Sequence, residues 1–542
     1  MDLPAEPSPA RVPADSAQAA DSAQAADSAF STESLQAAAS RVPAASEGGP
    51  AELPALAVRP VLGVAVALAA LLIAFSGRYG YHRDELYFIA CGKHLAWGYP
   101  DQPPFVPLLA RLMTDIAPSS LVVLRLPSAL AAAALVILTA LLTRELGGRS
   151  LAQVLACAIV ALAPVVTGSS HLLSTTAFDL PAWALLAWLF VRILRTGDQR
   201  LWLLAGLVAG IGLLDTDLVA FLIVAVVVGL AICGPRAPFR SPWFYGGGVL
   251  ALALWSPYLA WQASHAWPEL KVAHSIATGG SGTSAPWWLI VPEQFVLVAW
   301  YFSPVWLAGL WRFFRDPKLR WCRAAGVVFP VLAVAFMATG GKPYYLAAYL
   351  PVLIAAGAQP TVDWISRALP DRRRLLIAGF VISVLMLPIT LPILPVSVVH
   401  DTPIVALNYD AGETIGWPAF VHEVAAVDHT LPPAQRSAAI VLASNYGEAG
   451  AMQHYGPADG LPAVYSGHNT YWYWGPPPAS ATTAIVVGYE RGQLGFCGSL
   501  RLATRLDNHL GVNDQEQGAP VWICSELRSS WRALWPSQRF FG

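Results

Sequence analysis

The sequence predicts a polytopic α-helical membrane protein that ends in a small α/β domain. Of its 542 residues, 56% are hydrophobic and only 12% are charged, whereas soluble domains carry about 25% charged residues. The mean hydropathy is +0.51, and residues 57–395 alternate between apolar runs and short polar breaks. The net charge of −1 gives no reason to expect a nucleic acid as a partner.

Composition divides the chain into three regions. Residues 1–55 are rich in Ala, Ser, Asp and Pro and contain the tandem repeat "ADSAQA" at 14–19 and 20–25, which predicts a disordered N-terminal tail. Residues 56–395 form the predicted transmembrane domain. Residues 396–542 have ordinary soluble composition. The segment 437–456 predicts a strand, a loop and a helix, and 483–489 and 520–527 predict further strands of a small α/β domain.

About eleven membrane spans are predicted, because a helix needs roughly 20 apolar residues to cross a bilayer. The spans lie at residues 57–76, 121–142, 151–168, 179–195, 201–214, 218–234, 243–262, 288–311, 324–339, 345–360 and 375–395. Basic residues gather in alternate breaks, while the break at 169–178 has none. The positive-inside rule therefore places the N-terminus in the cytoplasm and the C-terminal domain outside the cell membrane.

The predicted outer loop at 77–120 keeps several basic residues against this rule, which predicts that it holds an anion. It contains His82, Arg83, Asp84 and Glu85 in succession. The ordinary interpretation is a helix N-terminus, where acids complement the helix dipole. Apolar residues follow at once, however, and a partly desolvated carboxylate gains the basicity that suits a general base. Neighbours on a helix point about 100° apart, so one acid should face the site while the other pairs with Arg83 or His82.

Two further outer segments carry candidate residues. Asp101 in "GYPDQPPF" (98–105) is either a turn cap or a second carboxylate of the site. The residues that follow, 104–114, are predicted to form a short amphipathic helix. Lys342 in "TGGKPYYLAAYLP" (339–351) either reaches to the membrane interface or binds an anion. Tyr344 and Tyr345 beside it are equally typical of an aromatic belt.

Other polar clusters point less clearly to chemistry. His265 and Glu269 are four residues apart, a spacing that suits a metal on a helix, but two ligands do not complete a site. The aromatic segment "HNTYWYWGPPP" (468–478) could stack on sugars or rest at the bilayer surface. Cys497 and Cys524 could form a disulfide if their domain is outside. No nucleotide-binding motif is present, so the energy for any reaction should come with an activated substrate.

Several of these segments together resemble a known family. They include "RDELYF" (83–88), "GYPDQPP" (98–104), "WQASHAWPEL" (261–270), "GKPYYLAAYLPVLIAAGA" (341–358), "NYGEAGAMQHYG" (445–456) and "GLPAVYSGHNTYWYWGP" (460–476). The chain resembles bacterial family 39 glycosyltransferases, membrane enzymes of the GT-C fold that are similar to protein O-mannosyltransferases and to the lipid A aminoarabinose transferase.

The resemblance implies inverting transfer of a sugar from a polyprenyl-phosphate donor to a glycan, lipid or protein acceptor at the outer face of the cell membrane. The implied catalytic residues are Asp84, Glu85 and Asp101. Donor-phosphate binding falls to Arg83, Lys93, Lys342, Tyr344 and Tyr345, and contacts with the acceptor or sugar to His82, His265 and Glu269. No cofactor and no metal site are expected, although the sequence leaves a divalent ion open.

Two departures from the family pattern remove basic residues. Gln102 stands before the Pro-Pro pair where relatives usually have His or Lys, and Thr216 stands where a Lys is often found. The alternative function is a non-catalytic lipid-binding protein or transporter of the same fold. A transporter is expected to carry charged residues at mid-membrane, whereas the charges here gather at the ends of the predicted spans.

Overall fold

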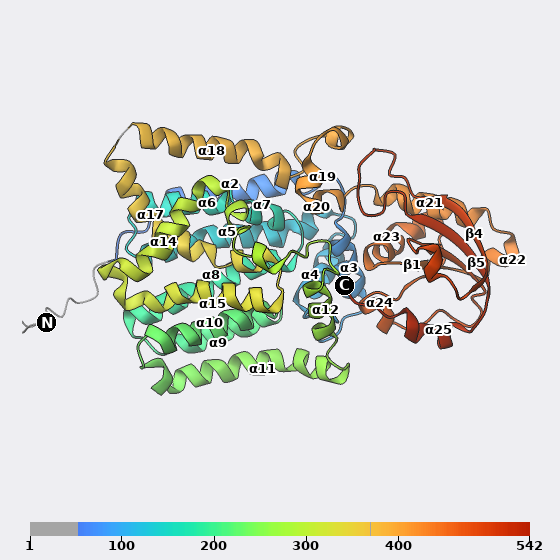
Figure 1. Ribbon diagram of the computed structural model, residues 1–542, viewed down its shortest axis with the longest axis horizontal. Coiled ribbons are helices and arrows are strands. Elements are labelled where there is room, and N and C mark those ends of the chain that lie inside the picture. Colours follow the sequence, from blue (N-terminus) through green and yellow to red (C-terminus); the bar gives the residue numbers. More distant parts are fainter. Residues whose placement is uncertain (1–52, 369) are drawn as a thin grey trace, which may run out of the picture. The chain divides into compact units, whose positions relative to one another are not determined.

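The structure is a computed structural model that describes residues 53–368 and 370–542. Most of the predicted N-terminal tail, residues 1–52, lies outside the described residues. Leu53–Gly542 form one compact unit in which a bundle of long helices is followed by a β-sheet region (Figure 1). The predicted domain boundary between residues 395 and 396 therefore falls inside one compact unit. That the transmembrane and C-terminal parts are separate domains stays a prediction.

Five segments of the described chain are long and apolar enough to cross a membrane. They are α2 (Val58–Phe75), α5 (Leu121–Glu145), α8 (Thr175–Thr196), the segment Pro317–Thr339 that ends in α15 (Arg323–Thr339), and α18 (Asp371–Thr390). A sixth arises if α6 (Ser150–Ala161) and α7 (Pro164–Ser170), which meet at 56°, form one bent span. The chain is thus a multi-pass membrane protein, and the count of eleven spans stays a prediction.

The other predicted spans also contain helices, but one of these spans is interrupted. The helices are α9 (Leu201–Leu213), α10 (Leu218–Cys233), α11 (Pro242–Ser264), α14 (Ser303–Arg315), α16 (Pro343–Ala347) and α17 (Leu350–Ser366). The predicted span 288–311 is not one helix, because it is divided among two 3-10 turns (Trp287–Leu289 and Trp300–Phe302), the short α13 (Gln294–Leu297) and most of α14. Pro292 and Pro304 interrupt the backbone hydrogen bonds, and Ala299 has a positive φ of 66°.

Small residues let the helices of the bundle approach closely. Helix α14 packs against α17, and α9 packs against α11. A Cβ atom on Gly309 would lie 1.8 Å from the carbonyl oxygen of Leu353, and one on Gly357 would lie 1.8 Å from that of Val305. Only glycine fits at this crossing, as is common between membrane helices, which gain stability from close packing rather than from the hydrophobic effect.

Short helices connect the bundle to the sheet region. They are α3 (Arg83–Lys93), α4 (Phe105–Ile116), α12 (Pro268–Ala277), α19 (Ile404–Leu407) and α20 (Tyr409–Gly412). The predicted amphipathic helix at 104–114 corresponds to α4 and is confirmed. Helix α3 packs against α23 (Tyr446–Tyr455) of the sheet region (Figure 1). This contact joins the predicted outer loop to the C-terminal part of the chain.

The C-terminal region contains a mixed five-stranded sheet with the strand order β2-β1-β3-β5-β4. Its strands are β1 (Ala439–Ala443), β2 (Val464–Ser466), β3 (Thr483–Val487), β4 (Cys497–Arg505) and β5 (Pro520–Leu527). Strand β1 pairs parallel with β2 and β3, whereas β5 pairs antiparallel with β3 and β4. The helices of this region are α21 (Trp417–His429), α22 (Pro433–Arg436), α23, α24 (Thr470–Tyr473) and α25 (Trp531–Gln538). The three predicted strands are confirmed, and β2 and β4 were not predicted.

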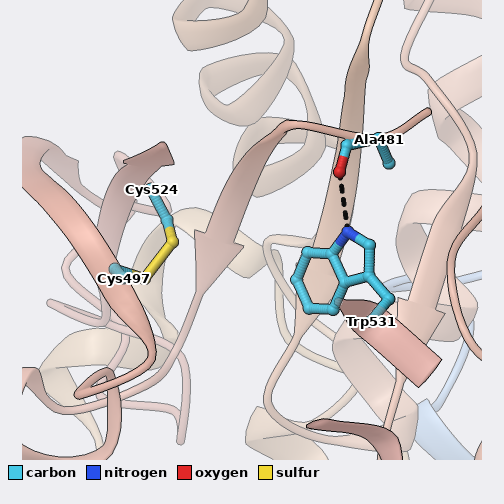
Figure 2. The surroundings of a disulfide bond; sticks show 4 residues. All are labelled: Ala481, Cys497, Cys524 and Trp531. Carbon is cyan, nitrogen blue, oxygen red and sulfur yellow. Dashed lines mark hydrogen bonds between the residues drawn. A yellow bond between two sulfur atoms is a disulfide. The ribbon is translucent and has the colours of Figure 1, made fainter. Parts of the chain in front are cut away.

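A disulfide joins Cys497 of β4 to Cys524 of β5 (Figure 2). In the same part of the sheet region, the indole Nε1 of Trp531 donates a hydrogen bond of 2.8 Å to the carbonyl oxygen of Ala481 (Figure 2). The disulfide that the sequence left open is therefore formed.

Replacing both Cys497 and Cys524 by Ser is expected to lower the free energy of unfolding by about 3 kcal/mol. The bridge spans 27 residues, and opening a loop of that length returns conformational entropy to the unfolded chain. Thermal unfolding of the purified protein checks this value. Cys233→Ser, which removes an exposed free thiol, should leave the midpoint unchanged, and equal midpoints for all three proteins would contradict the prediction.

Candidate functional site

Helix α3 begins with a capping box that separates the two adjacent carboxylates. The Nδ1 atom of His82 accepts a hydrogen bond of 3.2 Å from the backbone N–H of Asp84. The carboxylate of Glu85 in turn accepts one of 2.8 Å from the backbone N–H of His82. This arrangement satisfies the free N–H groups of the first turn and turns Asp84 and Glu85 toward different surroundings, as the sequence predicts.

Glu85 is fully buried and held by Arg125 of α5. The two guanidinium contacts measure 2.8 Å and 2.7 Å, and the backbone N–H of Leu173 donates another hydrogen bond of 2.8 Å. Burial alone would raise the pKa of Glu85, but the charge and hydrogen bonds of Arg125 hold it below its ordinary value. Glu85 is thus an anchor for α3 with no oxygen left for a substrate. The predicted partners were Arg83 or His82, and the structure shows Arg125 instead.

Asp84 is the carboxylate of the pair that solvent reaches, with a side chain 41% exposed. The hydroxyl of Tyr446, the first residue of α23, donates a hydrogen bond of 2.7 Å to Oδ1. The Oδ2 atom lies 3.9 Å from Nδ1 of His82. Asp84 therefore combines a fixed orientation with access from outside, which a general base requires.

His82 links Asp84 to a second carboxylate, Asp410 of α20. The Nε2 atom of His82 lies 3.6 Å from Oδ1 of Asp410. Burial would lower the pKa of His82, but the neighbouring Asp410 and Asp84 outweigh it and raise this pKa above its ordinary value. The pKa of Asp410 lies below its ordinary value in spite of partial desolvation, because His82 and Lys342 favour its charged form. The buried imidazole thus lies between two carboxylates, with Nδ1 accepting the backbone hydrogen bond of α3 and Nε2 facing Asp410.

Arg83 points into the C-terminal region. Its guanidinium donates hydrogen bonds to the hydroxyl of Tyr409 at 3.0 Å and to Glu413 at 3.1 Å, and it also contacts Gln515. The same group lies over the ring of Tyr446, 4.9 Å from its centroid. These contacts occupy Nη1 of Arg83, which the sequence suggested as a phosphate ligand, and they tie α3 to the C-terminal region, while Nε has no partner among the described residues.

Asp101 lies on the other side of a pair of tyrosines. Tyr87 donates a hydrogen bond of 2.9 Å to Oδ1 of Asp101, and the Nδ2 atom of Asn469 donates one of 3.0 Å to Oδ2. The ring of Tyr87 packs on that of Tyr446 at 4.7 Å, so Asp84 and Asp101 are connected through adjoining rings. Burial raises the pKa of Asp101 to about 7.

The raised pKa of Asp101 should make stability depend on pH. The folded-state pKa of about 7 exceeds the unfolded value of about 3.9, so between these values only the folded state binds the proton, and stability falls as pH rises. In Asp101→Asn the side chain does not titrate, so this fall in stability with rising pH is absent. Relative to the wild type, its free energy of unfolding should rise by roughly 1.4 kcal/mol per pH unit from pH 5 to pH 7. Denaturation across that range tests the slope, and a constant difference would contradict it.

Lys342, Tyr344 and Tyr345 gather at the start of α16. Lys342 is half-buried, and its Nζ lies 5.9 Å from the ring centroid of Tyr344. It forms no ion pair within 4.0 Å among the residues that the structure describes. The rings of Tyr344 and Tyr345 meet edge-on at 5.0 Å. Lys342 also favours ionisation of Asp410, which places its charge at the Asp84 end of the site.

Among the remaining predicted residues, the charge of Glu269 reaches the site, where it adds to the effect of burial in raising the pKa of Tyr345. His265 stacks on Trp261 at 4.1 Å, while Glu269 accepts a hydrogen bond of 3.2 Å from Tyr258. Because α11 ends at Ser264 and α12 begins at Pro268, His265 and Glu269 do not share a helix, and the spacing argument for a metal fails. Lys93 is exposed at the far end of α3, roughly 14 Å from Asp84 by helix rise.

The two positions that depart from the family pattern differ in their surroundings. Gln102 is buried, and its Nε2 has no hydrogen-bond partner among the described residues. Thr216 lies between α9 and α10, where its hydroxyl accepts a hydrogen bond of 3.3 Å from the backbone N–H of Leu218. Gln102 therefore offers a neutral donor close to Asp101, whereas Thr216 caps a local turn.

Sequence reasoning missed Arg125, Tyr446, Asn469 and Asp410. Arg125 had a signal, since a charged residue inside an apolar span is functional by default. Tyr446 and Asn469 lie inside segments that carry the family resemblance, but neither residue type indicates a role by itself. Asp410 follows the last predicted span without any motif.

Comparisons with known proteins agree with this architecture. Residues 101–261 match the family model described as dolichyl-phosphate-mannose-protein mannosyltransferase. No curated protein sequence matches the chain. Two crystal structures of ArnT from Cupriavidus metallidurans, one bound to undecaprenyl phosphate and one apo, each give a TM-score of 0.55 at 14% identity, covering 85% of this chain and 97% of ArnT. The cryo-EM structure of arabinofuranosyltransferase AftD from Mycobacteria gives a TM-score of 0.44 at 13% identity, covering 88% of this chain and 41% of AftD.

The predicted resemblance to family 39 glycosyltransferases is confirmed by the family match and the ArnT-like GT-C fold. The matched segment starts at Asp101 and ends at Trp261, so it includes Gln102 and Thr216 and excludes Asp84. Likeness at 14% identity shows the fold alone, and the roles of individual residues stay predictions.

Proposed function

We propose that the chain transfers a sugar from a polyprenyl-phosphate donor to an acceptor hydroxyl, as its match to the dolichyl-phosphate-mannose-protein mannosyltransferase family over residues 101–261 suggests. One observation carries the proposal. Asp84 is an exposed carboxylate held by Tyr446 and flanked by His82, at the point where the helical bundle meets the C-terminal region. A site that joins a lipid-bound donor to an acceptor at the outer face of the membrane needs such a place.

The proposed reaction is a single displacement. The acceptor oxygen attacks the anomeric carbon while Asp84 takes the hydroxyl proton, and the bond between that carbon and the phosphate oxygen breaks. The polyprenyl phosphate leaves, and the anomeric configuration inverts. Asp101 supports the site from behind Tyr87, and Glu85 acts by positioning α3 on Arg125.

We assign the donor phosphate to Lys342, with Tyr344 and Tyr345 beside it. Lys342 is the candidate cation on the Asp84 side whose charge no ion pair satisfies among the described residues. An ammonium group is a usual phosphate ligand, and undecaprenyl phosphate is the ligand named for the ArnT crystal structure. The chemistry needs no cofactor, since the donor is already activated.

Lys342→Ala is expected to raise the KM for the lipid-linked donor at least tenfold and to change kcat less. Removing the ammonium removes binding that acts on both ground state and transition state. Initial rates at varied donor concentration separate the two constants. Lys318→Ala, which changes an exposed lysine in the 3-10 turn before α15, is the matched control. An unchanged KM in Lys342→Ala would remove this residue from the phosphate site.

The proposed topology has eleven spans, with the N-terminus in the cytoplasm and both the site and the C-terminal domain outside the cell membrane. The distribution of basic residues supports it. The Cys497–Cys524 disulfide supports it independently, because disulfides persist in oxidising compartments.

Comparing cells with and without this gene tests the function. Loss of the gene should raise the pool of one polyprenyl-phosphate sugar and remove that sugar from one envelope glycan, lipid or protein, as read by mass spectrometry. Restoring the wild-type gene should reverse both changes. Identical pools and envelope profiles in the two strains would contradict the proposal and favour the non-catalytic alternative.

A further inference from the structure

A cavity of about 370 Å³ lies where α23, β2 and the segment after α24 meet the end of α3. Its lining includes His94, Gln453, Tyr465, Tyr471 and Trp474. The volume falls within the range of small-molecule sites. None of the residues that we place at the reacting centre lines it.

Two packed helices connect this cavity to Asp84. A Cβ on Gly447 would meet Arg83 at 3.0 Å, and one on Gly450 would meet Leu86 at 3.0 Å, so the packed helices α3 and α23 run in the same direction. Their first turns hold the Asp84–Tyr446 contact, and the cavity lies beyond their last turns. His94 follows Asp84 by ten residues, about 15 Å of helix rise.

Tyr471 forms a wall between the cavity and the reacting centre. Its ring stacks on that of Tyr87 at 6.2 Å, and the hydroxyl of Tyr87 binds Asp101. On the cavity side, Tyr471 donates a hydrogen bond of 3.1 Å to the side-chain oxygen of Gln453. This bond fixes the amide and leaves its NH₂ group without a partner among the described residues.

The aromatic rings of the cavity form a corner. The ring of Trp474 lies 4.4 Å from that of His94 and 4.6 Å from that of Tyr471. Trp474 is only half-buried, so part of its indole stays open to a ligand. The cavity thus pairs flat aromatic surface with a fixed amide donor and a histidine.

We propose that this cavity is an acceptor subsite that binds a sugar ring at a distance from the reacting hydroxyl. The C–H faces of a sugar ring are apolar and pack on aromatic surfaces, while its hydroxyls bond to amide and imidazole groups. A separation of about 15 Å from Asp84 suits an acceptor of several linked sugars. The assignment of the sugar to an acceptor rests on the proposed function.

A sugar fits the cavity better than a lipid chain does. A lipid chain needs a continuous apolar channel from the bilayer, whereas this cavity is lined by residues of the C-terminal region and the end of α3. Its polar groups, Gln453 and His94, would be left unpaired by an alkyl chain, which is costly when they are desolvated.

The test uses the full chain in detergent with Asp84→Asn, so that no turnover occurs. Binding is measured on an array of defined oligosaccharides that includes chitotetraose and mannotetraose, with no donor present. At least one oligosaccharide should bind, and Trp474→Ala should weaken its affinity at least tenfold and Gln453→Ala about fivefold. Trp474→Phe, which keeps an aromatic face and guards against misfolding, should retain most of the affinity.

Trp287→Ala is the matched control, because Trp287 is 59% exposed and lines no part of the cavity. It should leave binding unchanged. The proposal is overturned if no oligosaccharide binds, if Trp474→Ala binds as well as its parent, or if Trp287→Ala weakens binding equally.

The subsite and the reaction can fail separately. Oligosaccharide binding that depends on Trp474, together with no transfer from any lipid-linked donor, would uphold the subsite and reject the proposed function. Transfer by the wild type with an acceptor KM unaffected by Trp474→Ala would uphold the function and reject the subsite.

Discussion

Asp84→Asn is expected to lower kcat/KM for sugar transfer by about 10²–10⁴-fold. The amide cannot accept the acceptor proton, although it can still take the hydrogen bond from Tyr446. The side chain is exposed, so the change should leave stability and donor binding close to the wild type. Initial rates with a labelled polyprenyl-phosphate sugar, together with a thermal midpoint, separate loss of the base from loss of fold.

Asp115→Asn is the matched control for this variant. Asp115 is also an exposed carboxylate of a short helix, paired with Arg111 at 2.8 Å on the surface of α4. The same chemical change there should leave the rate unaltered. Full transfer by Asp84→Asn would remove Asp84 as the base and turn attention to Asp101.

Arg125→Met is expected to lower the free energy of unfolding by about 3–5 kcal/mol, because it leaves the buried carboxylate of Glu85 without its counter-charge. Arg125 also donates hydrogen bonds to the backbone carbonyls of Ser76 and Gly80, both at 2.6 Å. Removing it thus loosens the turn before α3 as well. Thermal or chemical unfolding in detergent measures the loss.

Two comparisons make this prediction specific. Arg111→Met breaks an exposed pair, which should cost at most about 1 kcal/mol. The double variant Arg125→Met, Glu85→Met removes both buried charges and should recover part of the loss. Equal effects of Arg125→Met and Arg111→Met would show that the Glu85–Arg125 pair does not anchor α3.

Much of the fold could be predicted because apolar runs directly indicate buried or membrane helices. The helices α2, α5, α8 and α15 match the predicted spans closely. Where prediction failed, local backbone chemistry decided the outcome, as in 288–311, where prolines break an apolar run. Strand β4 was missed because it is a largely exposed edge strand, and its only strand signal is the short alternation of Leu500, Arg501 and Leu502.

The site was predicted less completely, since its contacts join residues far apart in the chain. The sequence placed Asp84 and Glu85 in one turn and indicated that they diverge, and the structure agrees. The sequence could not indicate which of the two acids is buried, because the burial of Glu85 depends on its contact with Arg125, 40 residues further along the chain. The partner of Asp84, Tyr446, is 362 residues away.

The most direct test of the account is a cryo-EM structure of the Asp84→Asn protein in lipid nanodiscs with a polyprenyl-phosphate sugar bound. The account predicts that the phosphate lies within hydrogen-bonding distance of Lys342 and that the anomeric carbon faces residue 84. A donor seated elsewhere, with its phosphate away from Lys342 and its sugar away from residue 84, would contradict it.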